Sequence, residues 1–170
     1  MMKIFQVVGY KNAGKTTLVC EIVRELTNKG LRVGTVKHDV HDFEPDVTGT
    51  DTWQHRQAGA HITAITSPSR TAWVQEQSTP LEELVSDIRE HALDYLIIEG
   101  FKSAAYPKVV LLRNEQDNVL LSLTNIIAVI VREPNDSLQA QAKALAIPVF
   151  IQPDPVSSLS FIQYLIGLPS

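Results

Sequence analysis

The sequence predicts an α/β fold of three layers, a mostly parallel sheet flanked by helices, with a β-hairpin insertion near residues 61–75. The first 37 residues alternate between strand-like and helix-like spacing of apolar side chains, which is typical of a strand–helix–strand unit. Residues 95–98 form an unbroken apolar run, as expected of a central strand that is buried on both faces. With 170 residues, of which 44% are apolar, the chain is long enough for one domain, and we expect residues 1–170 to form a single unit.

The elements before residue 60 follow from this spacing. Apolar residues up to Val8 predict a first strand that ends at Gly9, and from Lys15 apolar residues recur at three- and four-residue intervals, which predicts a helix. Gly30 is a favourable residue just after a helix, and a strand over 31–37 follows it. Residues 38–50 fit neither period and are rich in aspartate, so we expect a long loop that is functional or mobile, followed by a short helix over 51–58.

The remaining elements alternate in the same way. Strands over 61–66 and 71–75 surround a Ser-Pro-Ser turn and predict the hairpin. Thr79 is expected to cap a helix with Pro80 at its first position and an apolar face that reaches Leu93. Further strands are expected over 95–98, 108–112, 126–131 and 149–151, and further helices over 136–145 and 156–166.

Composition excludes several partners. Fifteen Lys and Arg against 19 Asp and Glu give a net charge of −4, so the chain has no overall basic field, and we expect neither nucleic acid nor a membrane as a partner. The longest later apolar stretch, 126–131, is far shorter than a membrane span. The single cysteine, Cys20, can form no internal disulfide, which favours a reducing, cytoplasmic location.

One motif carries chemistry. Residues 9–16, GYKNAGKT, match G-x-x-x-x-G-K-[ST], the phosphate loop, and they lie between a predicted strand and a predicted helix. Such a loop turns backbone N–H groups toward a phosphate, the lysine reaches the β- and γ-phosphates, and the Ser/Thr hydroxyl binds Mg²⁺. The expected nucleotide contacts are Gly9, Lys11, Asn12, Ala13, Gly14, Lys15, Thr16 and Thr17.

Carboxylates are needed to complete a magnesium site. Glu99 ends the central strand in the position of a Walker B acid, so we expect the metal ligands to be Thr16, Glu99 and an acid of the long loop, Asp51 first and Asp39 second. Asp94, at the opposite end of that strand, is expected to be structural. Lys15 and Glu99 are the expected catalytic residues, and Gly100 lets the chain turn away from the phosphates. The residues His38, Asp39, His41 and Asp42 also suggest zinc, but their spacing does not favour it.

These residues resemble the family of molybdopterin-guanine dinucleotide biosynthesis protein B (MobB). The resemblance rests on the phosphate loop, on Ile98-Glu99-Gly100-Phe101-Lys102 with Pro107-Lys108, and on Lys37-His38-Asp39, Asp46, Gly49, Asp51, His55-Arg56 and Ala58-Gly59-Ala60. It implies a GTP-binding accessory protein in molybdenum cofactor biosynthesis, a homodimer that acts with a guanylyltransferase of the MobA type. It implies at most a slow Mg²⁺-dependent GTPase. No water-positioning glutamine or arginine finger can be assigned, although Arg56 and Lys11 are candidates.

An alternative reading remains. The Glu-Gly pair after the central strand is similar to that of dethiobiotin synthetase, which supports Thr16, Asp51 and Glu99 as ligands and leaves a small-molecule kinase or ATP-dependent ligase open. The arginines are dispersed along the chain rather than clustered in a lid. The guanine-reading signature Asn-Lys-x-Asp is absent, and the candidates at the equivalent position are Arg132, Glu133, Asn135 and Asp136, with Asp154 beside them.

A basic segment follows Glu99. We expect Lys102, with Lys108, Arg113, Phe101 and Tyr106, to form either a solvated rim or a surface for the anionic phosphate of molybdopterin or for the partner transferase. Gly100 and Lys102 therefore join the expected ligand contacts. The hairpin near residues 61–75 has an edge that would suit strand exchange in the implied homodimer.

Overall fold

The computed structural model describes residues 2–39, 41–152 and 155–168. These residues form two compact units, one of Met1–His38 with His91–Ser170 and one of Asp39–Glu90. The second unit is therefore an insertion in the chain of the first. Each unit is described by itself.

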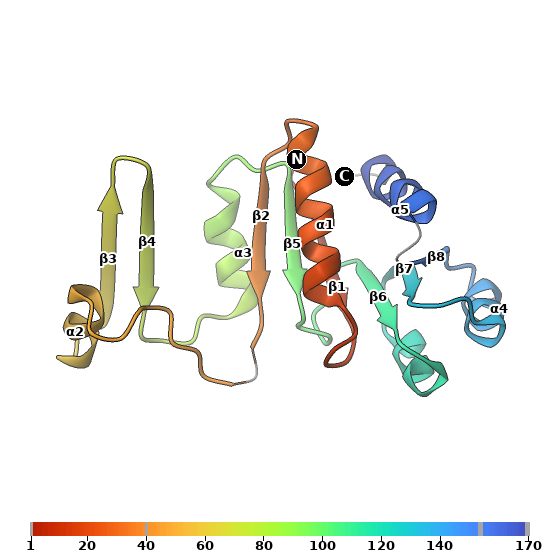
Figure 1. The fold of residues 1–170 in the computed structure, drawn as a ribbon, viewed down its shortest axis with the longest axis horizontal. Helices are drawn as coiled ribbons and strands as arrows, with labels where there is room; N and C mark the ends of the chain where they lie inside the picture. Colours follow the sequence, from red (N-terminus) through yellow and green to blue (C-terminus); the bar gives the residue numbers. More distant parts are fainter. Residues whose placement is uncertain (1, 40, 153–154, 169–170) are drawn as a thin grey trace. The chain divides into compact units, whose positions relative to one another are not determined.

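The first unit is built on a six-stranded sheet in the order β2-β5-β1-β6-β7-β8 (Figure 1). Every neighbouring pair in this sheet is parallel, which confirms the predicted sheet. Its strands are β1 (Lys3–Val8), β2 (Val33–Lys37), β5 (Tyr95–Glu99), β6 (Lys108–Leu112), β7 (Ile126–Val131) and β8 (Val149–Ile151). The strand that precedes the phosphate loop thus lies directly beside the strand that ends at Glu99, with Val7 opposite Glu99.

Helices cover both faces of this sheet and make the three expected layers. One core contains Val7, Val109 and Leu111 with side chains of α1 (Lys15–Asn28) and α5 (Pro155–Gly167). The other contains Val8, Val110 and Leu112 with side chains of α4 (Asp136–Ala144) and the 3₁₀ helix η1 (Glu115–Ser122). Successive residues of β1 and β6 alternate between the two cores, as the two-residue period of a strand requires.

The second unit holds α2 (Asp51–Gln57), the antiparallel hairpin of β3 (Ile62–Ser67) and β4 (Arg70–Gln75), and α3 (Leu81–Arg89). The hairpin confirms the predicted insertion, and Ser67 pairs with Arg70 across its turn. Large apolar side chains of this unit are exposed, among them Ile62, Ile65 and Trp73. No helix among the described residues is both long and apolar enough to span a bilayer.

Three local predictions were wrong, and one element was missed. Helix α3 begins at Leu81 after Pro80, so Thr79 is not its cap, and it ends at Arg89, well before Leu93. Strand β2 begins at Val33 rather than at residue 31, because the Arg32 N–H is bonded to the Asp94 carboxylate. The 3₁₀ helix η1 had no counterpart in the prediction.

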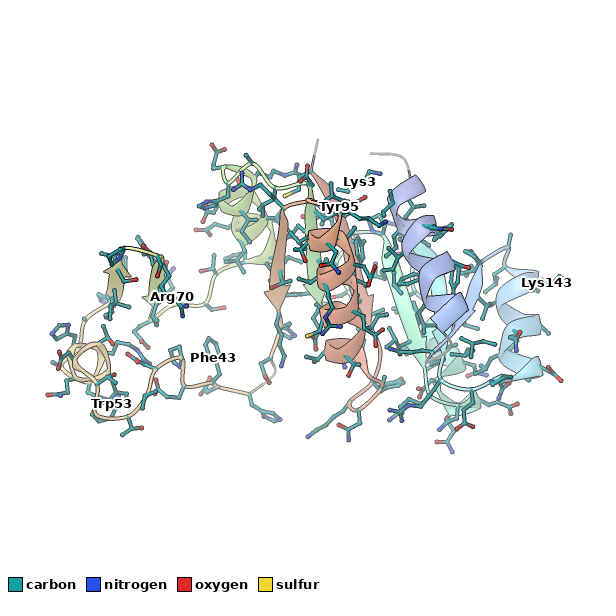
Figure 2. All side chains as sticks on the ribbon, turned by 45° about the horizontal axis from the view of Figure 1, so that its top comes forward. Lys3, Phe43, Trp53, Arg70, Tyr95 and Lys143 are labelled. Atoms are coloured by element: carbon teal, nitrogen blue, oxygen red, sulfur yellow. The ribbon has the colours of Figure 1, made fainter. Side chains whose placement is uncertain are left out.

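Lys3 ties the start of the sheet to the C-terminal helix. Its ammonium group donates to the carbonyl oxygens of Ile166 (2.9 Å) and Leu168 (2.6 Å), where α5 ends. It also lies 5.8 Å from the centre of the Tyr95 ring, and Figure 2 shows the two side chains near each other. A cation is favourable at a helix C-terminus, so this contact holds α5 on the sheet.

Candidate functional site

The loop between β1 and α1 has the backbone of a phosphate loop. Asn12 and Gly14 have φ angles of 63° and 90°, in the left-handed region, and Gly14 is the N-cap residue directly before α1. A Cβ atom at Gly9 would lie 3.0 Å from the Leu111 carbonyl oxygen and 3.2 Å from the Ala13 Cβ, so a side chain there would crowd the loop against β6. The loop therefore leads directly into a helix N-terminus, where an anion is stabilised.

Lys15 lies folded against this loop. Its Nζ donates to the Tyr10 carbonyl oxygen at 2.9 Å. Burial lowers the pKa of Lys15 from its ordinary 10.5, the Glu99 carboxylate opposes this, and Lys102, Lys37 and Arg113 lower the pKa further. Lys15 thus has three other cationic side chains near enough to affect its pKa, although the chain as a whole is acidic. Such a local positive field favours a polyphosphate.

The predicted metal ligands Thr16 and Glu99 are in contact. The Thr16 hydroxyl donates to Oε1 of Glu99 at 2.9 Å, and Glu99 is only 7% exposed at the end of β5. A hydroxyl and a carboxylate are the oxygen ligands that Mg²⁺ accepts at a phosphate loop. The donor set of this site therefore fits the expected ion.

Gly100 turns the chain sharply after Glu99. Its φ is 97°, and a Cβ atom there would lie 3.1 Å from the Cβ of His38. The His38 N–H donates to the Glu99 carbonyl oxygen at 2.9 Å, and the next residue, Phe101, stacks on the His38 ring with 4.5 Å between centres. Phe101 itself has φ of 51°, which is unusual for an aromatic residue. Such strain persists only where surrounding contacts fix the backbone.

Two buried polar side chains supply those contacts to the loop over residues 100–107. Nε2 of Gln6, from β1, donates to the carbonyl oxygens of Gly100 (2.9 Å) and Phe101 (2.6 Å). Nζ of Lys108, from β6, donates to those of Ala104 (2.6 Å) and Tyr106 (3.1 Å). The loop that follows Glu99 is therefore held by side chains of β1 and of β6.

This observation corrects the expectation for Lys108. The side chain is fully buried rather than part of a solvated rim, and burial lowers its pKa. It is a structural lysine, so the basic segment that remains at the surface consists of Lys102 and Arg113.

Arg113 contacts the phosphate loop, which the sequence did not predict. Its guanidinium donates to the Lys11 carbonyl oxygen at 3.1 Å and to both carboxylate oxygens of Asp117, at 2.9 and 2.7 Å. Asp117 is 1% exposed, and its hydrogen bonds with Arg113 hold the pKa of the carboxyl below its ordinary 3.8. A buried acid thus fixes an arginine that in turn holds the loop.

Tyr10 joins the two remaining cations. The Lys102 ammonium lies 4.1 Å from the centre of the Tyr10 ring, and the Arg113 guanidinium lies 5.3 Å from it. Both distances are within the range of cation–π attraction. Lys102, one of the expected ligand contacts, is therefore brought to the phosphate loop.

The other expected ligands belong to the second unit. Asp51 is the first residue of α2, whose N-terminus is capped by the Thr50 side chain, and Asp39 accepts a hydrogen bond from the His41 N–H. These contacts do not test whether either carboxylate binds the metal, so Asp51 and Asp39 remain predicted ligands. No three His, Cys, Asp or Glu side chains gather as a metal site among the residues that the structure describes. Asp94 accepts from the Arg32 N–H at 2.7 Å, which confirms its structural role.

The candidates for guanine recognition remain untested. Asn135 caps α4, because its side chain accepts from the Leu138 N–H at 2.9 Å, and Asp136 is in the first turn of that helix. These contacts favour a structural role for the pair. Asp154 lies outside the described residues.

Comparisons with known proteins agree on one family. The family model "Molybdopterin guanine dinucleotide synthesis protein B" matches residues 4–132. A relative in Bacillus subtilis (strain 168), "Probable molybdopterin-guanine dinucleotide biosynthesis adapter protein", is 36% identical over 156 residues, 91% of this chain and 88% of the relative. The "Molybdopterin-guanine dinucleotide biosynthesis adapter protein" of Escherichia coli (strain K12) is 34% identical over 120 residues, 67% of each chain. A crystal structure of Bacillus subtilis MobB superposes with a TM-score of 0.79 and 31% identity, over 98% of this chain and all of that chain.

Proposed function

Because the chain belongs to the family of molybdopterin guanine dinucleotide synthesis protein B, we propose that it binds GTP with Mg²⁺ and assists a guanylyltransferase in molybdenum cofactor biosynthesis. The observation that carries this proposal is the contact between Thr16 and Glu99 beside a phosphate loop of the required backbone form. This contact supports the proposal because a hydroxyl and a carboxylate are the oxygen ligands that a phosphate-bound cation prefers.

The phosphate loop and Glu99, both in the first unit, have separate parts in this binding. Backbone N–H groups of residues 9–14 and the N-terminus of α1 receive the phosphates, and Lys15 exchanges the Tyr10 carbonyl for phosphate oxygens. Thr16 and Glu99 hold Mg²⁺, with Asp51 proposed as a further ligand. Mg²⁺, when bound, neutralises charge on the β- and γ-phosphates.

We further propose that hydrolysis is slow and that the protein works mainly by binding. Lys15 and Glu99 are the only residues that we assign to catalysis. A water-positioning residue and an arginine finger, which accelerate other GTPases by orders of magnitude, have no assigned counterpart. The transfer of GMP to the cofactor then belongs to the partner, a transferase of the MobA type. Lys102 is proposed to face that partner or the phosphate of molybdopterin.

We also propose that the protein is cytoplasmic and forms a homodimer. The names of its relatives describe adapter proteins, which supports a role in bringing other molecules together. The exposed hairpin side chains Ile62 and Trp73 are the proposed contact between two copies.

Calorimetric titration of the full chain with GTP, GDP and ATP, each with and without Mg²⁺, tests the proposal. We expect GTP to bind more tightly with Mg²⁺ than without, and more tightly than ATP, and we expect Lys15→Ala to abolish binding of all three. Asp51→Ala and Asp39→Ala, compared with Glu99→Ala, identify the third ligand as the variant that also loses the effect of Mg²⁺.

A steady-state assay separates this function from the kinase or ligase alternative. Slow release of phosphate from GTP, together with tight binding, supports an adapter. Rapid transfer of phosphate from ATP to a small acceptor would instead establish the alternative. Nucleotide affinity that is unchanged in Lys15→Ala would refute both.

A further inference from the structure

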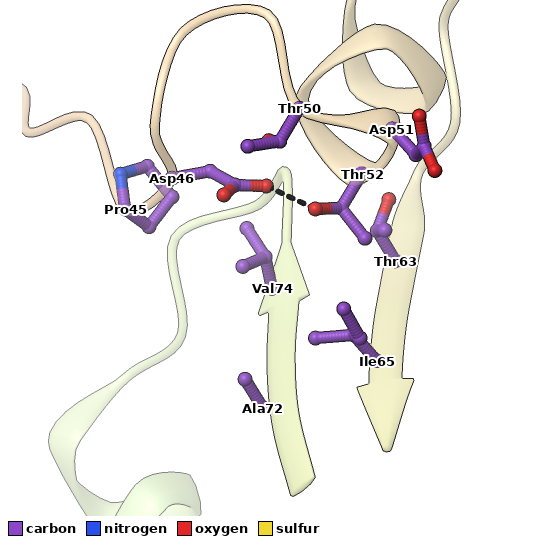
Figure 3. Close-up of a pocket in the computed structure, with 9 residues that line it drawn as sticks. All are labelled: Pro45, Asp46, Thr50, Asp51, Thr52, Thr63, Ile65, Ala72 and Val74. Carbon is purple, nitrogen blue, oxygen red and sulfur yellow. Dashed lines mark hydrogen bonds between the residues drawn. The ribbon is translucent and has the colours of Figure 1, made fainter. Parts of the chain in front are cut away.

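The second unit contains a cavity that the proposed nucleotide site does not use. It measures about 420 Å³ and lies between the start of α2 and one face of the β3–β4 hairpin (Figure 3). All of its lining residues belong to the second unit. Asp46, Thr50 and Thr52 line it from the start of α2 and the segment before it, and the hairpin contributes Thr63 together with the apolar Ile65 and Val74.

The Thr63 hydroxyl is the unusual group in this cavity. Thr63 is 7% exposed, and its Oγ1 has no hydrogen-bond partner among the described residues. In Figure 3 this hydroxyl points toward the helix that carries Asp51 and Thr52. A buried polar group without a partner costs stability, and few such groups occur in native proteins. The cavity thus offers one donor and acceptor that a ligand could satisfy.

The Asp46 carboxylate faces the same cavity as an acceptor. It accepts from the Thr52 hydroxyl and from the Val47 N–H, and the first of these bonds is the main cause that holds the pKa of Asp46 below its ordinary 3.8. An ionised carboxylate has about four lone-pair positions, so it can accept further hydrogen bonds. In Figure 3 the Asp51 carboxylate points away from Val74 and Ile65, which leaves Asp46 as the anion beside these apolar side chains.

These groups define the chemistry of a ligand. A fixed carboxylate excludes phosphate and favours a group rich in N–H donors, the Thr63 hydroxyl suits a carbonyl oxygen, and aliphatic side chains suit a flat ring. Guanine and pterins share such a ring, a 2-amino-4-oxopyrimidine, with N–H donors on one edge and a carbonyl oxygen beside them.

We propose that this cavity binds the 2-amino-4-oxopyrimidine ring of a guanine nucleotide or a pterin, with Asp46 as acceptor for its N–H groups and Thr63 as donor to its carbonyl oxygen. The inference rests on the proposed function, since that function supplies both kinds of ring. The cavity belongs to the second unit alone, and its acidic lining suits an uncharged ring rather than a phosphate.

Titrations of the full chain with compounds that carry no phosphate test this inference. Neopterin and guanosine present the ring, whereas lumazine and inosine lack its 2-amino group. We expect at least tenfold tighter binding of the aminated compound in one pair or in both, because a site built for an N–H donor rejects an analogue without it. Preference for neopterin assigns the cavity to the pterin, and preference for guanosine assigns it to the nucleotide.

Variants of Thr63 connect this binding to the cavity. Thr63→Val should weaken binding of the preferred compound at least tenfold without lowering the thermal midpoint of the free protein, because it removes an unpaired buried hydroxyl. Thr63→Ser should retain the affinity within about threefold. Thr66→Val is the matched control on the same strand, because the Thr66 hydroxyl pairs with Thr71 and does not line the cavity.

Three results would overturn the inference: no binding of neopterin or guanosine, equal binding within each pair, or unchanged affinity in Thr63→Val. Its failure is distinct from failure of the proposed function. Lys15→Ala should bind neopterin as the wild type does while it loses GTP. A protein that binds neopterin but shows no Mg²⁺-dependent affinity for GTP would contradict the proposed function alone.

Discussion

Glu99 illustrates how a single residue reveals function. A carboxylate that is 7% exposed loses most of its hydration, and burial of a charge is costly unless partners compensate it. The Thr16 hydroxyl supplies one hydrogen bond, and Lys15 is near enough for the Glu99 charge to raise its pKa. These two groups compensate the buried charge of Glu99 only in part, and a bound cation would complete the compensation.

Glu99→Gln should therefore remove the effect of Mg²⁺ on GTP binding. The amide keeps the size of the side chain but is a poor ligand for a hard cation, so we expect the affinity for Mg²⁺–GTP to fall about tenfold or more. Affinity measured in EDTA should stay within about threefold of the wild type. Asp94→Asn, at the other end of β5, is the control and should leave the Mg²⁺ effect intact. A Mg²⁺ effect of wild-type size in Glu99→Gln would remove Glu99 from the metal site.

Asp117 should give the protein a measurable sensitivity to acid. Because Arg113 lowers its pKa in the folded state, the stabilisation is complete above 3.8 and is lost as the pH falls through the lowered pKa. Asp117→Asn should lower the free energy of unfolding by about 2 kcal/mol at pH 7 and lose less stability below pH 4 than the wild type does. Urea unfolding between pH 3 and pH 7 measures both. Parallel pH profiles for the two proteins would contradict the assignment.

The residues of the site divide by whether sequence can find them. Thr16 and Glu99 occupy fixed positions in a motif and at a strand end, so the sequence was sufficient to predict their proximity. Arg113 and Lys108 carry no such signal, because an arginine after a strand and a lysine at its start look like surface residues. Only the structure shows that Arg113 donates to the Lys11 carbonyl oxygen of the phosphate loop and that Lys108 turns inward to the Ala104 carbonyl oxygen.

At the scale of elements, the loop over residues 100–107 is held near the site by several side chains. Gln6 and Lys108 engage four of its carbonyl oxygens, and Asn125 engages that of Ala105 at 2.7 Å. With its carbonyl groups held in this way, the loop has little freedom to move. These bonds position the backbone of Lys102, whose ammonium group lies 4.1 Å from the centre of the Tyr10 ring.

Gly100→Ala should disturb this loop more than a glycine replacement elsewhere. Its left-handed φ costs about 1–2 kcal/mol for alanine, and the 3.1 Å contact with the His38 Cβ adds to this, so we expect a loss of about 2–3 kcal/mol of unfolding free energy. Gly30→Ala is the matched control, because Gly30 has φ of 78° and no atom within 4 Å of its Cβ position. Equal losses in chemical denaturation would show that the contact with His38 is unimportant. GTP affinity should fall in Gly100→Ala only.

Local geometry explains the elements that the sequence missed or misplaced. The apolar residues among the eight of η1 follow neither the helical nor the strand period. Short 3₁₀ helices depend on local contacts, and here the Asn114 side chain caps the first turn. Helix α3 begins one residue later than its sequence signals suggested, because Pro80 keeps an extended ψ of 147°. Long apolar strands were predicted well, since burial on both faces leaves little ambiguity.

At the scale of the molecule, the exposed side chains of the hairpin should decide the oligomeric state. We expect light scattering to give twice the chain mass of 18.9 kDa, as the proposed homodimer requires. Trp73→Glu places a charge on a side chain that is 65% exposed, so it should yield a mass of 18.9 kDa without lowering secondary structure content. Ser69→Glu, in the hairpin turn, is the control and should remain a dimer. A dimeric Trp73→Glu would exclude this face as the contact.

The insertion of the second unit has a consequence for a cut chain. Residues 39–90 separate β2 from β5, yet these strands pair along their whole length, from Val33 opposite Tyr95 to Lys37 opposite Glu99. A protease that cleaves between them would therefore produce two fragments that remain together through the sheet. The nicked protein should migrate as two pieces in denaturing gels and as one particle in native gels, with its phosphate loop and Glu99 contributed by different polypeptides.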